Sequence, residues 1–156
     1  MKFSLERILV AIDGSAASLA AARFAIDVAA SRLATVRAVA VVGKDRDERI
    51  AAQLIDRVGE GADSQARRRA ALEDAVAHLV RLGTEAGVTV ERALRVSPDR
   101  EPYDVILDEA DEWRAHVVVV GRGSHRGIGR ALLGSQAEHL LEFAMIPVIV
   151  VPQPAD

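Results

Sequence analysis

The sequence predicts one α/β domain with a doubly wound parallel sheet, and three observations predict it. Short runs rich in valine, isoleucine and leucine alternate with longer alanine-rich segments of helical period. Most of these runs are continuously apolar, as strands covered by helices on both faces must be. The chain of 156 residues is long enough for one domain that buries most of its apolar surface. We therefore expect a single domain over residues 1–156.

Two strands and two helices are predicted in the N-terminal half. Ile8–Ile12 is an apolar run ended by the turn-forming sequence Asp-Gly-Ser. Apolar residues then recur at helical spacing to about residue 31, and a second apolar run follows at Val36–Val42. Residues 43–61 begin with the charged run KDRDER and are expected to form a surface excursion, with a helical turn at 50–55. Alanines and leucines at helical spacing predict a long helix over about 63–86.

Three strands and two helices are predicted in the C-terminal half. Val88–Val96 alternates apolar and polar residues, which is typical of a strand. Pro102 suits the first turn of a helix that would run to about Trp113. The remaining predicted elements are a strand at 117–120, a helix at 135–144 and a strand at 148–151.

The composition excludes several classes of function. The net charge of −3 gives no general attraction to nucleic acid or to anionic membranes, so we expect neither as a partner. The absence of cysteine excludes disulfides and thiolate metal sites, and it fits a cytoplasmic protein. The N-terminus does not have the pattern of a signal peptide, and no apolar run is long enough to span a bilayer. The four histidines have no metal-binding spacing, and no catalytic residue is predicted.

Two loops carry the chemistry of a binding site. In an open α/β sheet, ligands bind beyond the carboxyl ends of the strands, where the strand order reverses. Asp13-Gly14-Ser15 follows the first predicted strand, and GRGSHRGIGRALLGS, residues 121–135, follows the fourth. Glycine lets backbone N–H groups approach a phosphate, and the start of a helix favours an anion. If these strands are neighbours, an acid and a glycine-rich basic loop face each other.

The residues alone leave two interpretations of the second loop open. It has no P-loop lysine, and Arg126 stands where a dinucleotide fingerprint needs its third glycine. Ser135 and Glu138 match a capping box, with Ser135 as the N-cap, so Gly134-Ser135 is equally well explained as a helix start. Asp13 is likewise explained as a turn or cap residue. The local chemistry favours a phosphate site and a surface loop equally.

Two blocks of the sequence resemble the universal stress protein family. ERILVAIDGSAASLAAARFA resembles the family's N-terminal strand and helix, and VGRGSHRGIGRALLGSQAEHLLEFAMIPVIVVP resembles its C-terminal signature. The resemblance covers nearly the whole chain and is weakest at about 44–61. It implies a Rossmann-like fold of the adenine-nucleotide alpha hydrolase type, with five parallel strands in the order 3-2-1-4-5 and helices on both faces. It also implies a homodimer formed through the fifth strands, residues 148–151.

One subgroup of the family has an ATP site marked by G-x2-G-x9-G-[ST]. The pattern aligns with Gly121, Gly134 and Ser135, but Ser124 stands at its middle glycine. If that position needs a positive φ, serine there costs roughly 1–2 kcal/mol. Gly123, one residue earlier, is placed to supply the bend instead.

The resemblance implies a role for each matching residue. Asp13 would contact the ribose or the polyphosphate, directly or through Mg²⁺. Ala11, with Val41 or Val42, would line the adenine, and the glycine loop would hold the phosphates. The implied nucleotide-binding residues are Ala11, Asp13, Val41, Val42, Gly121, Arg122, Gly123, Ser124, Gly134, Ser135 and Gln136.

We therefore expect a regulator of the stress response that binds ATP with Mg²⁺, or AMP or another adenine nucleotide, and hydrolyses ATP slowly at most. The alternative is a dimeric interaction module of the same fold that binds no nucleotide, which Ser124 and Glu138 favour. An adenylating enzyme is a third hypothesis, although the short chain leaves little room for an acceptor site.

Overall fold

The computed structural model describes residues 2–43, 60–123 and 133–154, with the side chains of residues 60–64 left out. Its sheet has five strands, all parallel, in the order β3-β2-β1-β4-β5. Both the predicted fold class and the expected strand order are thereby confirmed. The strands are β1 (Arg7–Ala11), β2 (Thr35–Val42), β3 (Val90–Val96), β4 (Val117–Gly121) and β5 (Val148–Val151). The helices are α1 (Ala16–Arg32), α3 (Glu60–Glu85), α4 (Pro102–Trp113) and α5 (Ser135–Phe143).

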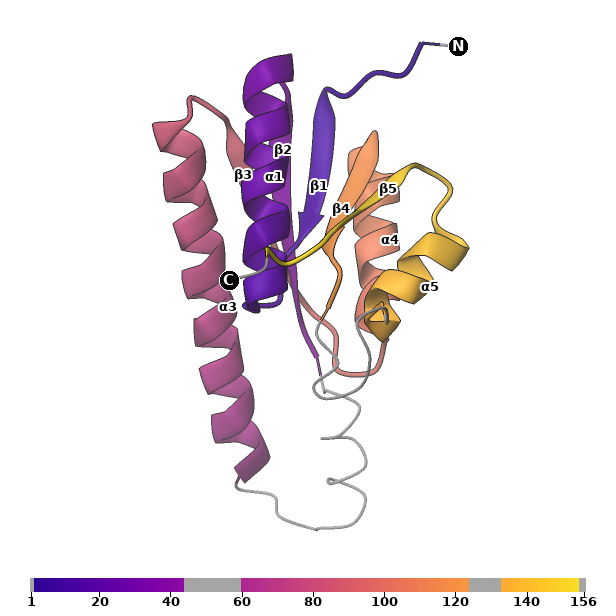
Figure 1. Ribbon diagram of the computed structural model, residues 1–156. Helices are drawn as coiled ribbons and strands as arrows, with labels where there is room; N and C mark the ends of the chain where they lie inside the picture. Colours follow the sequence, from indigo (N-terminus) through magenta and orange to yellow (C-terminus); the bar gives the residue numbers. More distant parts are fainter. Residues whose placement is uncertain (1, 44–59, 124–132, 155–156) are drawn as a thin grey trace.

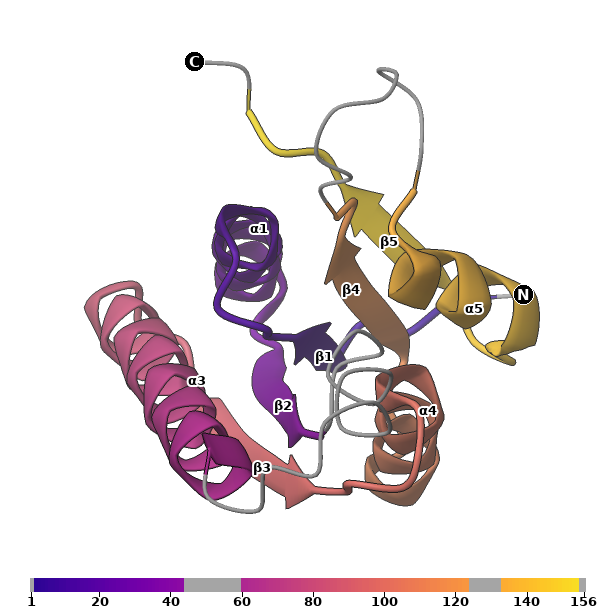
Figure 2. The same cartoon turned by 90° about the horizontal axis from the view of Figure 1, so that it is seen from below.

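The helices form a layer on each face of the sheet. Helices α1 and α3 cover one face, and α4 and α5 cover the other, as the view along the strands shows (Figures 1 and 2). Each face has its own apolar cluster, because successive residues of a strand point to opposite faces. Ile8 and Val10 lie in the cluster under α1 and α3, whereas Leu9 and Ala11 lie under α4 and α5. All four side chains are buried, which explains why the predicted strands are continuously apolar.

Alanine controls how closely α1 approaches the sheet. The buried positions of the helix are mostly alanine, whose small side chain allows close packing.

The start of α1 is capped by a side chain. Ser15 accepts a hydrogen bond from the Ser18 N–H at 3.1 Å. The turn before it holds Asp13, whose Oδ1 accepts from the Ser15 N–H at 2.9 Å, and Gly14 at φ +84°. The Asp-Gly-Ser sequence is therefore a turn followed by a serine cap, as the residues indicated.

Helix α1 ends at a strained residue. Leu33 has φ +56° and ψ +36° in the left-handed region, and 95% of its surface is exposed. We expect Leu33→Gly to raise the free energy of unfolding by about 0.5–1 kcal/mol, because glycine removes the left-handed strain but loosens the unfolded chain. Urea unfolding followed by circular dichroism measures the change.

Arg23→Gly, at an exposed position inside the same helix, is the matched control. It should lower the free energy of unfolding by about 1 kcal/mol, because glycine is a poor helix former. Equal losses from both glycines would show that Leu33 carries no strain.

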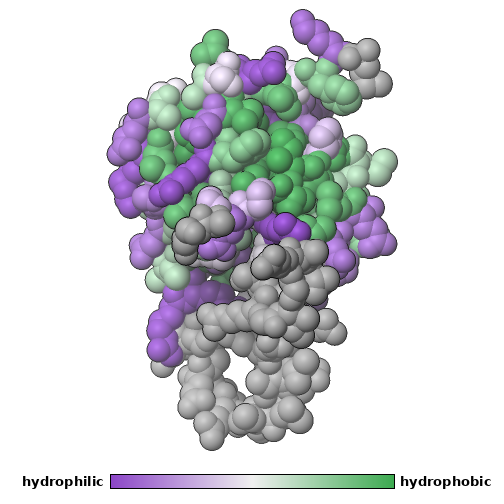
Figure 3. All heavy atoms as spheres, in the orientation of Figure 1, coloured by the Kyte–Doolittle hydropathy of each residue, from purple (hydrophilic) through white to green (hydrophobic). Residues whose placement is uncertain are grey.

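One face of the molecule is apolar at the edge of the sheet. Strand β5 is an edge strand made of Val-Ile-Val-Val, and its side chains are only half-buried. Figure 3 shows hydrophobic residues gathered on the side of the molecule where β5 crosses in front of the sheet in Figure 1. Leu141, Phe143 and Met145, just before β5, are also exposed. Among the described residues, no helix is both long enough and apolar enough to cross a bilayer.

Candidate functional site

The predicted site residues that the structure describes lie at or beside the carboxyl edge of the sheet. Strands β1 and β4 are neighbours, so the turn at Asp13 and the segment after Gly121 leave the sheet side by side. Contact at this edge is direct: a Cβ on Gly121 would lie 2.5 Å from the carbonyl carbon and oxygen of Ala17, in the first turn of α1. Gly121 is thus required by the packing of α1 on β4, whatever else it does.

The glycine loop is closed at its base by backbone contacts. Arg122 N–H donates to the Val151 carbonyl at 2.9 Å, and Gly134 N–H donates to the Arg122 carbonyl at 2.7 Å. Gly123 has φ +84°, and a Cβ on it would lie 2.9 Å from the Gly134 Cα. Glycines at 123 and 134 therefore let the two ends of the loop touch. Gly123 does adopt the bend that its position allowed, whereas Ser124 lies outside the described residues.

Helix α5 starts at Gly134-Ser135, but the capping-box interpretation of this start is wrong. The N-cap is Gly134, in extended backbone at φ −60° and ψ 152°, and no side chain caps the helix. Ser135 is the first helical residue, and the Glu138 N–H donates to the Gly134 carbonyl at 3.0 Å. The helix starts there because Gly134 is held by the Arg122 carbonyl and packed against Gly123. The Ser135 hydroxyl is consequently not used as a cap.

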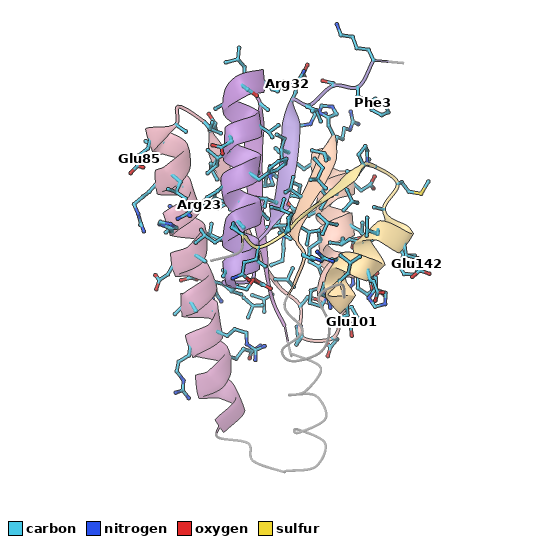
Figure 4. All side chains as sticks on the ribbon, in the orientation of Figure 1. Phe3, Arg23, Arg32, Glu85, Glu101 and Glu142 are labelled. Atoms are coloured by element: carbon cyan, nitrogen blue, oxygen red, sulfur yellow. The ribbon has the colours of Figure 1, made fainter. Side chains whose placement is uncertain are left out.

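The side chain of Gln136 has a role that the sequence did not reveal. Its Oε1 accepts a hydrogen bond from the Tyr103 N–H at 2.9 Å, and its Nε2 lies 3.5 Å from Glu101 Oε2. Gln136 thus joins the first turn of α5 to the first turn of α4, close to Glu101 at the lower end of α4 (Figure 4). Three near-parallel rings extend the same contact, with the Tyr103 and His139 centroids 4.4 Å apart and Phe143 5.8 Å from Tyr103. Desolvation, with the nearby carboxylates of Asp104, Glu101 and Glu142, raises the pKa of the Tyr103 hydroxyl.

The three residues expected to line a base do not share one face of the sheet. Ala11 and Val41 belong to the side covered by α4, whereas Val42 is buried under α1 and α3. Asp13 is exposed just beyond Ala11, and its Oδ2 has no partner among the described residues. Ala11 and Val41 therefore share the α4 face near the turn at Asp13, whereas the Val42 side chain lies on the opposite face.

A small cavity lies on the other side of the Asp13 turn. Its volume is about 230 Å³ and its lining is mostly apolar, with Ile12, Leu19 and Leu79 among the lining residues and His78 beside them. It is lined by residues of both α1 and α3, and none of the predicted nucleotide-binding residues lines it. No group of three or more His, Cys, Asp or Glu residues that could hold a metal ion occurs in the part of the chain that the structure describes.

A buried ion-pair cluster, which the sequence did not predict, lies beneath α4. The Glu109 carboxylate is 2% exposed, with Oε1 at 2.8 Å from Arg37 Nη1 and Oε2 at 2.8 Å from Arg95 Nη2. Arg37 also contacts Glu91 at 3.0 Å, and its guanidinium lies 4.7 Å from the centre of the Trp113 ring. Partial desolvation lowers the pKa of Arg37, but the hydrogen bonds to Glu109 and Glu91 outweigh it, and the net pKa is raised.

The run Arg67-Arg68-Arg69 is more than a solvated face. Arg68 Nη1 donates to the Gly43 carbonyl at 2.6 Å, so α3 holds the end of β2. Arg69 pairs with Glu73 one turn later in α3.

Solved structures of similar fold hold adenine nucleotides. A universal stress protein of Arabidopsis thaliana with AMP bound matches with a TM-score of 0.69 and 19% identity, over 96% of this chain and 93% of that one. One from Archaeoglobus fulgidus in complex with dAMP matches with a TM-score of 0.60 and 23% identity, over 96% of this chain and 99% of that one. A third is in complex with cAMP, with a TM-score of 0.65, 22% identity and coverage of 97% and 99%. At these identities the likeness shows the fold alone.

Other relatives and a family model show to which family the chain belongs. A universal stress protein of Methanocaldococcus jannaschii is 28% identical over 96% of this chain and 83% of its own length. One from Mycolicibacterium smegmatis is 34% identical over 92% of this chain, which spans 47% of that relative. A crystal structure from Burkholderia pseudomallei matches with a TM-score of 0.74 and 25% identity, over 95% and 96% of the two chains. The model of the universal stress protein family matches residues 4–152, and the chain therefore belongs to that family.

Proposed function

We propose that this protein binds an adenine nucleotide, ATP with Mg²⁺ first among them, and acts as a cytoplasmic regulator of the stress response rather than as a fast enzyme. The observation that carries the proposal is the start of α5, which has a glycine N-cap and no side-chain cap. Unpaired N–H groups and the helix dipole at such a start favour an anion. The nucleotides held by relatives of the same fold support an adenine nucleotide as that anion.

The first turns of α1 and α4 are capped by side chains, whereas the first turn of α5 is not. Helix α1 has the Ser15 hydroxyl on the Ser18 N–H, and α4 has the Gln136 side chain on the Tyr103 N–H. On α5, the N–H groups of Ser135 and Gln136 have no acceptor among the described residues. The phosphates would therefore bind at the first turn of α5, with Ser135 donating its hydroxyl.

The rest of the nucleotide would extend from α5 towards β1 and β2. Asp13 Oδ2 is exposed and accepts readily from a ribose hydroxyl or ligates Mg²⁺ on the phosphates. Ala11 and Val41 offer apolar contact for the base on the α4 side. A P-loop lysine is absent from the sequence, and none of the described residues of the proposed site is placed as a catalytic base, so hydrolysis would be slow at most.

Calorimetric titration with ATP and Mg²⁺ tests the proposal, with one variant that separates binding from folding. Wild-type protein should bind one nucleotide per chain. Ser135→Asp should weaken ATP binding by at least about tenfold, because a carboxylate would repel the phosphates. The same change should not destabilise the protein, since an acid in the first turn suits the helix dipole.

Ser135→Asn is the neutral control and should lose much less affinity than Ser135→Asp. Folded wild-type protein that shows no binding at millimolar nucleotide would overturn the proposal. That result would favour the alternative, a dimeric interaction module of the same fold that binds no nucleotide.

Strand β5 favours a second element of the proposal, a homodimer formed through the free edge of the sheet. The opposite edge strand, β3, carries Glu91, Arg92 and Arg95, charges that discourage strand pairing, whereas β5 has none. The exposed Leu141, Phe143 and Met145 extend the apolar surface beside it. Both features support a second copy as the partner.

Sedimentation of Val150→Pro tests the dimer. The carbonyls of Pro147 and Val151 point to β4, so the alternate residue Val150 points its N–H to the free edge. Proline there removes an edge donor without breaking the β4–β5 ladder. We expect a wild-type dimer and a folded Val150→Pro monomer, and a wild-type monomer at high concentration would refute the interface.

A further inference from the structure

The ion-pair cluster beneath α4 runs towards the proposed base site. Arg37 and Val41 of β2 pair in register with Glu91 and Arg95 of β3. Paired residues of neighbouring parallel strands point to the same face, so these side chains all lie on the α4 side. Arg37 and Glu91 lie farther from the carboxyl edge, and Arg95 lies closest to it.

Arg95 is held in a fixed orientation. Its Nε and Nη2 both lie 2.8 Å from Glu109 Oε2, and the other carboxylate oxygen of Glu109 is taken by Arg37. Because the carboxylate is buried in α4, the plane of the Arg95 guanidinium is fixed by two hydrogen bonds. Even so, 45% of the Arg95 side chain is exposed.

Register places Arg95 beside the residues proposed to line the base. Val41 is the direct partner of Arg95, at the strand spacing of about 4.8 Å. Ala11 pairs with Val39, which pairs with Ala93, and these small apolar residues lie on the same face. A flat aromatic group lying on Ala11 and Val41 would therefore meet Arg95 at its outer side.

We propose that Arg95 recognises the base, with its guanidinium, oriented by Glu109, stacking against the base as the outer wall of the site. The inference rests on the proposed nucleotide-binding function. A guanidinium stacks well on aromatic rings because it is planar and weakly hydrated. Because Glu109 balances the charge of Arg95, Arg95 would strengthen binding through the base and not through the phosphates at α5.

Binding of adenosine, AMP and ATP to matched variants tests the inference. Arg95→Met should weaken all three by about the same factor, roughly tenfold, because all three carry the same base. Arg95→Lys keeps a charge that reaches Glu109 but loses the planar group, so it should weaken binding nearly as much. It also guards against loss of folding in Arg95→Met.

Arg37→Met is the control, because it removes the other partner of Glu109 at the far end of the cluster. It should lower the melting temperature yet leave the three affinities within about twofold of wild type, because Arg37 lies away from the base. Circular dichroism and thermal unfolding of each variant separate lost folding from lost binding.

Each other outcome overturns the inference in a distinguishable way. Wild-type protein that binds none of the three ligands overturns it together with the proposed function. Wild-type protein that binds, with Arg95→Met binding equally well, overturns this inference alone. A loss that grows from adenosine to ATP would mean that Arg95 contacts phosphate, and an equal loss in Arg37→Met would mean that the cluster only holds α4 in place.

Discussion

Gly121→Ala is expected to lower the free energy of unfolding by about 3 kcal/mol, because the new Cβ has no room. It would lie 2.5 Å from two backbone atoms of Ala17, and backbone cannot swing aside as a flexible side chain can. Either α1 or the end of β4 must shift, and both belong to the packed core. Urea unfolding followed by circular dichroism measures the loss.

Gly87→Ala is the control for this change. Gly87 has φ +72°, but a Cβ on it would meet nothing within 4 Å, so alanine there adds only backbone strain, partly offset by the stiffer unfolded chain, for a net loss of about 0.5–1 kcal/mol. A Gly121→Ala loss no larger than the Gly87→Ala loss would show that α1 and β4 are not in close contact. A larger loss in Gly121→Ala would show that packing against Ala17 is enough to require glycine at this position, without any contact to a phosphate.

Glu109→Gln is expected to lower the free energy of unfolding by about 2 kcal/mol. The amide keeps the shape of the side chain but removes its charge, and its NH₂ group would face an arginine donor at 2.8 Å. Fully buried pairs lose about 3–5 kcal/mol when one partner is removed. The loss here is smaller because Arg37 and Arg95 are 21% and 45% exposed and water can reach them.

Glu91→Gln is the matched change at the exposed side of the same cluster. Glu91 is 41% exposed, so removing its charge should change the free energy of unfolding by no more than about 0.5 kcal/mol. Urea midpoints with an unchanged m-value provide both numbers. If the two variants lose equal stability, burial of Glu109 is not what makes the cluster matter.

The strands could be predicted because each of them follows from local sequence. Continuous apolar runs such as Val117–Val120 are buried on both faces of the sheet. Pro102 begins α4, a position that suits its fixed φ. The strand order, by contrast, came from the resemblance to a family. The placement of Asp13 beside β4 followed from that order.

The helix start and the ion-pair cluster could not be read from local sequence for physical reasons. Ser135 and Glu138 have the spacing of a capping box, but Gly134 is fixed by the Arg122 carbonyl, twelve residues earlier in the chain. Arg37 and Glu109 meet across 72 residues. One signal was available: alternation in Val90–Val96 puts Glu91 and Arg95 on one face, and two charges on a covered face call for buried partners.

The closed base of the glycine loop separates two kinds of evolutionary constraint. Gly123 and Gly134 touch, the Arg122 N–H ties one end of the loop to Val151 of β5, and the Gly134 N–H ties the other end to Arg122. We therefore expect β4 and α5 to keep their places when the sequence between these ends changes, because closing a somewhat longer loop costs little entropy. The sequence of that interval is then free to diverge among relatives while the sheet stays under its own selection.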